Sequence, residues 1–377
     1  MAYKKLLRNR VDKKLRCIFS CVAITVNSIP VIAAICMFLL TNIENSALMM
    51  KISMFLFTLF IQFILLRLSF YPFWLFSSNK KWTFFGALLS ASMVFVYLYS
   101  VFVTRIDYEI KEIEVGFSNL PAEFDGYRVV FISDIHIGSM YNAVEELNEL
   151  AGAVESTNAD IILFGGDLIN LHHTELNAEL LSILSGIKGK EQTLSVIGNH
   201  DTGTYISNKK DEINENDIKA FEKLVENCGW KVLRDSTVYI YRNNDSIAIT
   251  GIDYSNELLK HKHSFGNVES FNCDYIYNSV DDSVFNITVS HLPQLWYSLC
   301  DAGYSDLTLS GHIHAMQLKI SLLGYLFSPA QFMYNEWSGL YEREKGKLYI
   351  NDGIGTVAYY SRIGSNPEIT AITLRKR

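Results

Sequence analysis

Long apolar runs dominate the first hundred residues of the chain. Residues 17–40 and 82–103 contain no charged side chain, and residues 46–66 contain only Lys51. About 20 consecutive apolar residues are enough for a helix to cross a bilayer, and a lysine near a helix end can extend its ammonium group to the interface. The pattern therefore predicts an all-α transmembrane region over residues 1–105 with about three helices, at 17–40, 46–66 and 82–103.

The residues before the first apolar run are strongly basic, with lysine or arginine at positions 4, 5, 8, 10, 13, 14 and 16. A cleaved secretory signal peptide also begins this way, but its apolar stretch is shorter and ends at a small-residue cleavage site. Because basic residues mark the cytoplasmic side, three spans predict a multi-pass protein of the cell membrane whose remainder, residues 106–377, is extracytoplasmic. A middle run that re-enters the membrane without crossing it would reverse this orientation.

From residue 127 onward, short β-branched runs alternate with helical stretches and polar turns, which is typical of an α/β domain. Asp, Asn or His follows closely after each of five runs that we predict to be buried strands: residues 128–133, 159–164, 193–197, 285–290 and 306–310. In open α/β sheets, sites form beyond the carboxyl ends of the strands. The sequence thus predicts one site built from these strand ends.

The distribution of charge also divides the chain after residue 105, where the predicted transmembrane region ends. The 377 residues carry a net charge of −7, but this is the sum of +10 over residues 1–105 and −17 over residues 106–377. A generally basic nucleic-acid binder is excluded, because the basic part is also the apolar part, and no nucleic acid partner is expected. A transporter is disfavoured because the apolar runs carry no ionisable residue deep in a span.

The residue types at the strand ends indicate a metal site. Five of the nine histidines lie there, together with carboxylates and one amide. Mixed oxygen and imidazole ligands suit Mn, Fe or Zn better than Ca²⁺, which takes oxygen only, or a structural zinc, which recruits cysteine. The alternative, that these are turn and cap residues, leaves the histidines unexplained. The candidates are Asp134, His136, Asp167, Asn199, His200, Asp201, His291, His312 and His314.

Five motifs occur in a fixed order: Asp134-x-His136, Gly166-Asp167, Gly198-Asn199-His200-Asp201, His291 and Gly311-His312-x-His314. From about residue 120 to the carboxyl end, the chain resembles the calcineurin-like metallophosphoesterases, and residues 120–127 and 362–370 are similar to the membrane-anchored bacterial branch. The resemblance implies a two-sheet β-sandwich flanked by helices, in four α/β/β/α layers, that holds two divalent metal ions.

The resemblance also implies a role for each candidate. Asp134, His136 and His314 would bind one ion, Asn199, His291 and His312 the other, and Asp167 would bridge them. His200 and Asp201 would be catalytic, His200 as the acid near the leaving oxygen and Asp201 as the residue that orients its ring. The implied function is metal-dependent hydrolysis of a phosphodiester or phosphomonoester bond, with a phosphodiester favoured and with lipid-linked or cell-envelope substrates as candidates. A non-catalytic, metal-dependent binding ectodomain is the alternative, but a binder does not need His200.

Three other features have two interpretations each. The apolar segment 318–334 could accept the acyl chains of a lipid-linked substrate or form strands of the second sheet. His172 and His173 could contact substrate, although a solvated loop is favoured, and His261 and His263 are interpreted as polar surface. Cys228, Cys273 and Cys300 lie outside the metal motifs, allow at most one disulfide in this part of the chain, and are expected to be thiols.

Overall fold

The structure, a computed structural model, describes residues 47–75, 80–205, 213–259, 271–278, 280–281, 283–344 and 346–377, together with Ser28, Ile32 and Ile35. The chain divides into two compact units. One comprises the residues up to Phe102 together with Ala358–Ser361, and the other comprises Val103–Val357 and Arg362–Arg377. Nearly all of the predicted span 17–40, and the segment with His261 and His263, lie outside the described residues.

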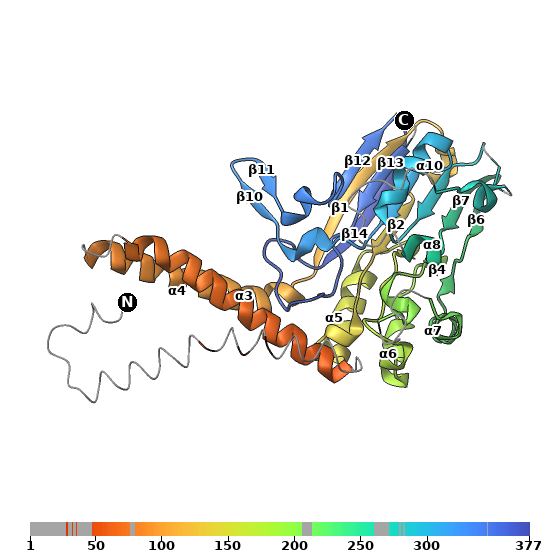
Figure 1. The fold of residues 1–377 in the computed structure, drawn as a ribbon. Helices are drawn as coiled ribbons and strands as arrows, with labels where there is room; N and C mark the ends of the chain where they lie inside the picture. Colours follow the sequence, from red (N-terminus) through yellow and green to blue (C-terminus); the bar gives the residue numbers. More distant parts are fainter. Residues whose placement is uncertain are drawn as a thin grey trace. The chain divides into compact units, whose positions relative to one another are not determined.

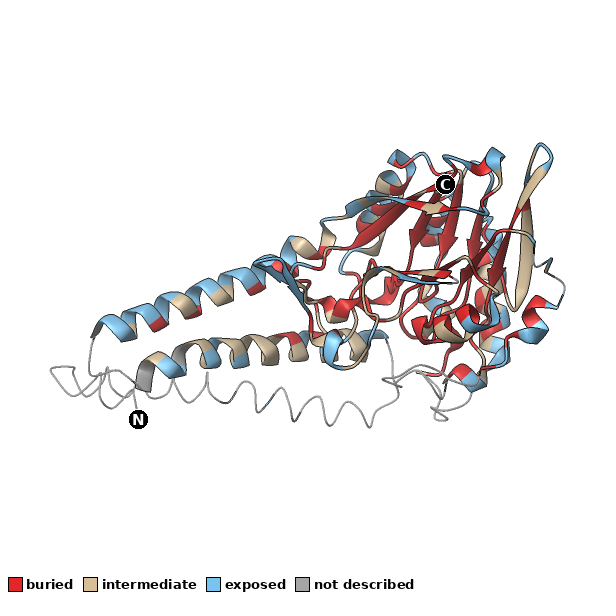
Figure 2. Ribbon diagram, turned by 90° about the horizontal axis from the view of Figure 1, so that it is seen from above, coloured by how far each residue is buried: buried red, intermediate tan, exposed pale blue. Residues whose placement is uncertain are grey.

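Two long apolar helices, α3 (Ala47–Leu75) and α4 (Lys80–Phe102), form most of the described part of the first unit. Both are long and apolar enough to cross a membrane, and the predicted spans 46–66 and 82–103 fall on them. Most of their described side chains are exposed or half-buried, as Figure 2 shows. This exposure is what helices need when lipid is their solvent.

Hydroxyl groups satisfy backbone groups inside this first unit. The Tyr97 hydroxyl donates to the carbonyl of Thr58 at 2.9 Å, and the Thr58 hydroxyl in turn accepts the N–H of Tyr360 at 2.9 Å. Ser100 and Ser361 share a hydrogen bond of 2.7 Å between their hydroxyls. Polar groups in apolar surroundings need such internal partners. The segment Ala358–Ser361 is thus bonded to both helices.

Two six-stranded sheets form the centre of the second unit (Figure 1). The first sheet has the order β1 (Glu109–Phe117), β14 (Glu368–Lys376), β2 (Arg128–Ile132), β3 (Ile161–Phe164), β4 (Gln192–Ser195) and β5 (Lys231–Val232). The second has the order β12 (Gly339–Arg343), β13 (Gly346–Ile350), β9 (Leu307–Ser310), β8 (Asn286–Val289), β7 (Asp245–Gly251) and β6 (Ser236–Arg242). The five predicted strands are β2, β3, β4, β8 and β9.

The central strands of both sheets are parallel. In the first sheet β2, β3, β4 and β5 run in one direction, and β14 is antiparallel to β2. In the second sheet β13, β9, β8 and β7 are parallel, and the edge strands β12 and β6 are antiparallel to their neighbours. A separate hairpin consists of β10 (Ile320–Leu322) and β11 (Tyr325–Phe327).

Helices complete the second unit. They are α5 (Ala143–Ser156), α6 (Ala178–Leu184), α7 (Glu215–Asn227), α8 (Asn256–Leu259), α9 (Asp274–Tyr277) and α10 (Trp296–Ala302). Asparagine side chains accept a backbone N–H at the amino-terminal ends of α5, α6 and α7. Such caps satisfy amide groups that have no partner within the helix.

Alternating side chains place β2 between two hydrophobic cores. Val129 and Phe131 pack with residues of the second sheet, whereas Val130 and Ile132 pack with residues of α5, α6 and α7. On the outer face of the second sheet, residues of α10 pack with residues of β13. The layers are therefore helix, sheet, sheet and helix, and the predicted fold class is confirmed.

A buried ion pair lies near the beginning of the second unit. The Arg105 guanidinium donates two hydrogen bonds to the Glu146 carboxylate, at 2.6 and 3.2 Å, and both side chains are buried. Because Arg105→Met leaves a buried carboxylate without its cation, we expect the free energy of unfolding to fall by about 3–5 kcal/mol. Urea unfolding of the full chain in detergent, followed by tryptophan fluorescence, measures the change.

The matched control for this prediction is Arg375→Met. Arg375 pairs with Glu114 at 2.5 Å, but both side chains are largely exposed, so water already screens the pair. We expect this variant to unfold nearly like the unmodified chain. If both variants lost the same free energy of unfolding, burial would not explain the stabilising effect of the Arg105–Glu146 pair.

Candidate metal centre

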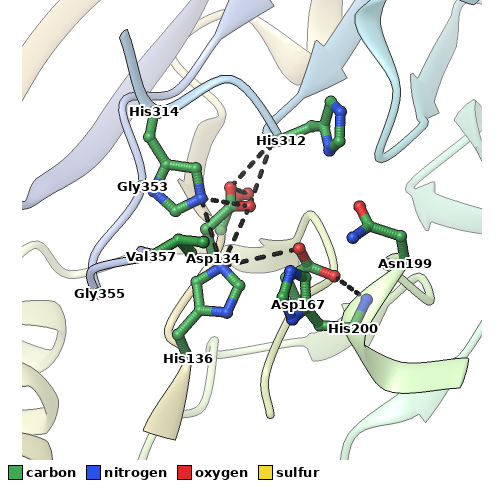
Figure 3. A network of polar contacts seen from close by, with 12 residues as sticks. Asp134, His136, Asp167, Asn199, His200, His312, His314, Gly353, Gly355 and Val357 are labelled. Carbon is green, nitrogen blue, oxygen red and sulfur yellow. Dashed lines mark hydrogen bonds and ion pairs between the residues drawn. The ribbon is translucent and has the colours of Figure 1, made fainter. Parts of the chain in front are cut away.

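The carboxyl ends of five parallel strands bring the predicted site residues together (Figure 3). Each strand is followed by its own contribution: Asp134 and His136 after β2, Asp167 after β3, Asn199, His200 and Asp201 after β4, His291 after β8, and His312 and His314 after β9. Strands from both sheets therefore contribute to one cluster.

One group of ligand candidates consists of Asp134, His136 and His314, all buried. The Nε2 atom of His314 lies 3.1 Å from Oδ1 of Asp134 and 3.3 Å from Nε2 of His136. The Nδ1 atom of His136 is buried and has no hydrogen-bond partner. Three potential ligand atoms thus lie within 4.8 Å of one another.

A second group consists of Asp167, His291 and His312, with Asn199 beside it. Nε2 of His291 lies 3.3 Å from Oδ2 of Asp167 and 3.0 Å from Oδ1 of Asn199. The other ring nitrogen of His291 donates to the carbonyl of Gly165 at 2.8 Å, which fixes the tautomer in which Nε2 can bind a metal.

Asp167 lies between the two groups. Its Oδ2 atom is 3.7 Å from Nε2 of His136 in one group and 3.3 Å from Nε2 of His291 in the other. Its Oδ1 atom accepts the backbone N–H of His200 at 2.8 Å. This is the position that a bridging ligand requires.

The backbone around the site is strained and closely packed. Five ligand candidates adopt positive φ angles, Asp134, His136, Asp167, His312 and His314, although that region costs a non-glycine residue about 1–2 kcal/mol. Side chains at Gly198 and Gly311 would collide with the carboxylates of Asp167 and Asp134, respectively. Glycine at these two positions therefore allows the backbone to lie close to the two carboxylates.

The residues present fit two divalent cations. Asp134 and Asp167 are buried carboxylates surrounded by imidazoles, and Asp167 of the second group also lies 3.7 Å from Nε2 of His136 in the first group. Carboxylate, imidazole and amide oxygen together form a donor set for Mn²⁺, Fe or Zn²⁺. The strained backbone further indicates a site organised around a bound group.

Electrostatics favours the metal-binding forms of several ligands. Burial raises the pKa of Asp134 and Asp167, but the neighbouring His314 and His291 outweigh it and hold each pKa below its usual value. Burial and then the charge of His200 lower the pKa of His136 well below its usual value. Carboxylates and a neutral imidazole are the forms that bind cations.

His291 predicts a pH dependence of metal binding. Burial lowers its pKa, but the charge and hydrogen bond of Asp167 outweigh burial and raise the pKa to about 9. Since a metal binds neutral imidazole, loading at neutral pH must release this proton. We expect Mn²⁺ affinity to rise with pH up to about 9, and calorimetry in buffers of different ionisation enthalpy counts the protons. Binding without proton release would contradict this assignment.

His200 lies at the edge of the cluster in the short helical turn His200–Thr202. Its Nδ1–H group donates to the carbonyl of Asn170 at 2.6 Å, and its ring stacks on Tyr205 with the centroids 4.2 Å apart. Tyr205 also accepts a hydrogen bond from Nδ2 of Asn199 at 2.9 Å. These contacts hold the ring with Nε2 as the nitrogen that can exchange a proton.

The prediction that Asp201 orients the His200 ring is wrong, because the ring is bonded to the Asn170 carbonyl. The buried Asp201 carboxylate instead accepts four backbone N–H groups, from Asp167, Leu168, Ile169 and Gly198, at 2.7–3.1 Å. Burial and the charge of Asp167 raise its pKa to about 8, and the backbone donors oppose this shift. Asp201 thus ties together the turns that carry Asp167 and Asn199.

Residues of the second unit between Asp352 and Val357, and from Arg362 to Ser365, lie beside the ligand candidates, and sequence reasoning missed them. The fully buried Arg362 guanidinium donates to the carbonyls of Asp352, Gly355 and Ser365 at 2.6–3.1 Å, and its Nη2 atom lies 3.4 Å from Nδ1 of His314. Arg362 thereby supports a ligand candidate from behind. The sequence pointed to Arg362 only through the segment 362–370, which is similar to the membrane-anchored bacterial branch.

The thiols and the two adjacent histidines lie away from these ligand groups. Cys228, Cys273 and Cys300 are buried free thiols, as expected. His172 and His173 are half-buried and lie beside Asp217 of α7.

Comparison with known proteins assigns the family. The family model for calcineurin-like phosphoesterases matches residues 127–316, half of the chain. The chain therefore belongs to the calcineurin-like phosphoesterase family, and the resemblance inferred from its motifs is confirmed. Membership implies a phosphoester hydrolase, and the family normally binds two divalent metals.

Curated relatives extend this similarity to most of the chain. The chain is 27% identical over 299 residues to the uncharacterized metallophosphoesterase YkuE of Bacillus subtilis. The aligned residues cover 77% of this chain and 94% of that protein. The chain is 26% identical over 275 residues to a transmembrane protein with metallophosphoesterase domain from Danio rerio, covering 71% of this chain but only 57% of the relative. It is 24% identical over 252 residues to the phosphodiesterase YaeI of Escherichia coli, covering 66% and 82%.

Proposed function

We propose that this chain is a membrane-anchored phosphodiesterase that cleaves a lipid-linked or cell-envelope phosphodiester outside the cytoplasm. The observation that carries the proposal is the pair of adjacent ligand groups with Asp167 between them, and with His200 held beside them. A relative named a phosphodiesterase supports the type of ester. The membrane part of the proposal is supported by α3, α4 and a relative named a transmembrane protein.

Two divalent ions, held by Asp134, His136 and His314 on one side and Asn199, His291 and His312 on the other, would activate water and neutralise phosphoryl charge. Water attack on phosphorus forms one P–O bond as the ester P–O bond breaks. The departing alkoxide takes the proton from Nε2 of His200, whose ring Asn170 and Tyr205 hold in place. The attacking water releases one proton to solvent, and a proton from solvent restores Nε2, so the step balances. Asp201 keeps the turn of Asp167 fixed during this step.

An exposed apolar hairpin supports a lipid-linked substrate. It consists of β10, β11 and the residues after them, with these side chains exposed: Ile320, Leu322, Leu323, Tyr325, Leu326, Phe327 and Phe332. Leu323 is 91% exposed and Tyr325 81%, and neither strand pairs with the second sheet, so the alternative of core strands is wrong. Apolar side chains gathered on a surface mark an interaction site, and acyl chains match their chemistry.

The hairpin predicts a dependence on acyl length. Replacing Leu323 and Tyr325 by serine removes two apolar contacts, so we expect kcat/KM for a long-chain phosphodiester in mixed micelles to fall about tenfold. Hydrolysis of a short, water-soluble diester should change far less. The comparison needs the full chain and both substrates, and equal losses for the two substrates would contradict the lipid role.

Metal removal tests the catalytic proposal. Full-length protein stripped with a chelator should lose diester hydrolysis and regain it with Mn²⁺, Fe²⁺ or Zn²⁺. Binding of two metal equivalents without hydrolysis of any diester would favour the alternative of a binding ectodomain. The side of the membrane is tested separately, by protease protection of a tag placed after Arg377 in right-side-out and inverted vesicles.

A further inference from the structure

A second cluster of metal-ligating side chains lies outside the predicted centre. It consists of His172, His173 and Asp217, whose ligand atoms lie within 4.8 Å of one another. Nε2 of His172 is 3.4 Å and Nδ1 of His173 is 3.9 Å from the same oxygen, Oδ1 of Asp217. Two adjacent imidazoles from one loop thus face a single carboxylate oxygen on another element.

The details of this cluster match a metal site more closely than a hydrogen-bonded loop. Nδ1 of His173 is buried and has no hydrogen-bond partner, although it faces Asp217. Tetrahedral zinc with bonds of about 2.0–2.1 Å separates its ligand atoms by roughly 3.3 Å, which is close to the His172–Asp217 distance. Two histidines and one carboxylate also form a known three-ligand set for zinc, with the fourth position left to water.

Neighbouring residues hold the three ligands in this orientation. Nδ1 of His172 accepts the backbone N–H of Thr174 at 3.4 Å and lies 2.9 Å from the Thr174 hydroxyl, so Nε2 of that ring is directed toward Asp217. Nδ2 of Asn214 donates to the other carboxylate oxygen of Asp217 at 2.8 Å and leaves Oδ1 for the histidines. Metal-binding histidines and carboxylates are commonly supported by such outer contacts.

We propose that His172, His173 and Asp217 bind a third divalent metal ion, of the zinc type, that fastens the loop after Asp167 to the first turn of α7. The same loop supplies the Asn170 carbonyl that holds the His200 ring. The third ion therefore acts by positioning: it fixes the loop whose Asn170 carbonyl holds the ring of His200. This ion uses other ligands than the two predicted catalytic ions, because none of its three residues belongs to their groups.

Zinc stoichiometry tests this proposal on the full chain in detergent. Metal-stripped protein is titrated with Zn²⁺ alone against a chromophoric chelator, and we expect three equivalents. The double variant His172→Ala/His173→Ala and the variant Asp217→Asn should each bind one equivalent less. Glu226→Gln, which removes an exposed carboxylate from the same helix, is the control and should keep all three.

A measurement without substitutions guards against variants that fail to fold. Diethyl pyrocarbonate modifies accessible histidines, and peptide mass spectrometry resolves the peptide that contains His172 and His173. We expect zinc to protect this peptide as the third equivalent binds. Equal zinc content in the unmodified chain and the double variant, or equal modification of this peptide with and without zinc, would overturn the proposal. None of these readouts depends on hydrolysis, so failure here leaves the phosphodiesterase proposal untouched.

Discussion

Replacing Asp167 by asparagine is expected to lower kcat for phosphodiester hydrolysis by about 10² to 10⁴-fold. Asp167 is buried between His136 of one ligand group and His291 of the other. An amide has nearly the same shape but no negative charge, so it cannot hold two cations close to each other. Steady-state kinetics with Mn²⁺, together with metal analysis of the same sample, measures the effect.

The matched control for this variant is Glu155→Gln. It makes the same change from carboxylate to amide at an exposed position near the end of α5, where no ligand candidate lies. We expect its turnover and metal content to equal those of the unmodified chain. If Asp167→Asn retained two metal equivalents and turned over within about tenfold of the unmodified chain, Asp167 would not be the bridging ligand.

The parts of the architecture that depend on short stretches of sequence could be predicted. The strands β2, β3, β4, β8 and β9 are short apolar runs that end in polar turns, so their positions could be inferred from the sequence. The insertion of β14 between β1 and β2 could not, because it pairs Glu109–Phe117 with Glu368–Lys376 from the far end of the chain. Nothing in either segment specifies its neighbour.

The site shows the same division. Every ligand candidate follows a predicted strand, so the motif order and the geometry of parallel strands were enough to bring them together. Asn170 and Arg362 were missed because they act through a carbonyl group and through contacts behind the ligands. Asp201 was assigned to its sequence neighbour His200, but the turn directs its carboxylate toward backbone amides. Contacts made after a turn depend on backbone direction, which a motif does not contain.

The role of His200 predicts that the effect of its loss depends on the leaving group. The Nδ1–H group is bonded to Asn170, so Nε2 is the atom that can protonate the departing oxygen. An alkoxide needs that proton, whereas a nitrophenolate leaves readily without it. We expect His200→Asn to lower kcat by about 10² to 10⁴-fold for an alkyl ester and by less than about tenfold for a nitrophenyl ester.

Tyr205→Phe separates proton donation from general damage to the site. Phenylalanine keeps the ring that stacks on His200 but loses the hydroxyl that accepts from Asn199. Since Asn199 holds one of the two metal ions in our proposal, this variant should slow hydrolysis of both esters by the same factor. Equal losses for the two esters in His200→Asn as well would mean that His200 stabilises the phosphoryl group, because only a proton donor distinguishes one leaving oxygen from another.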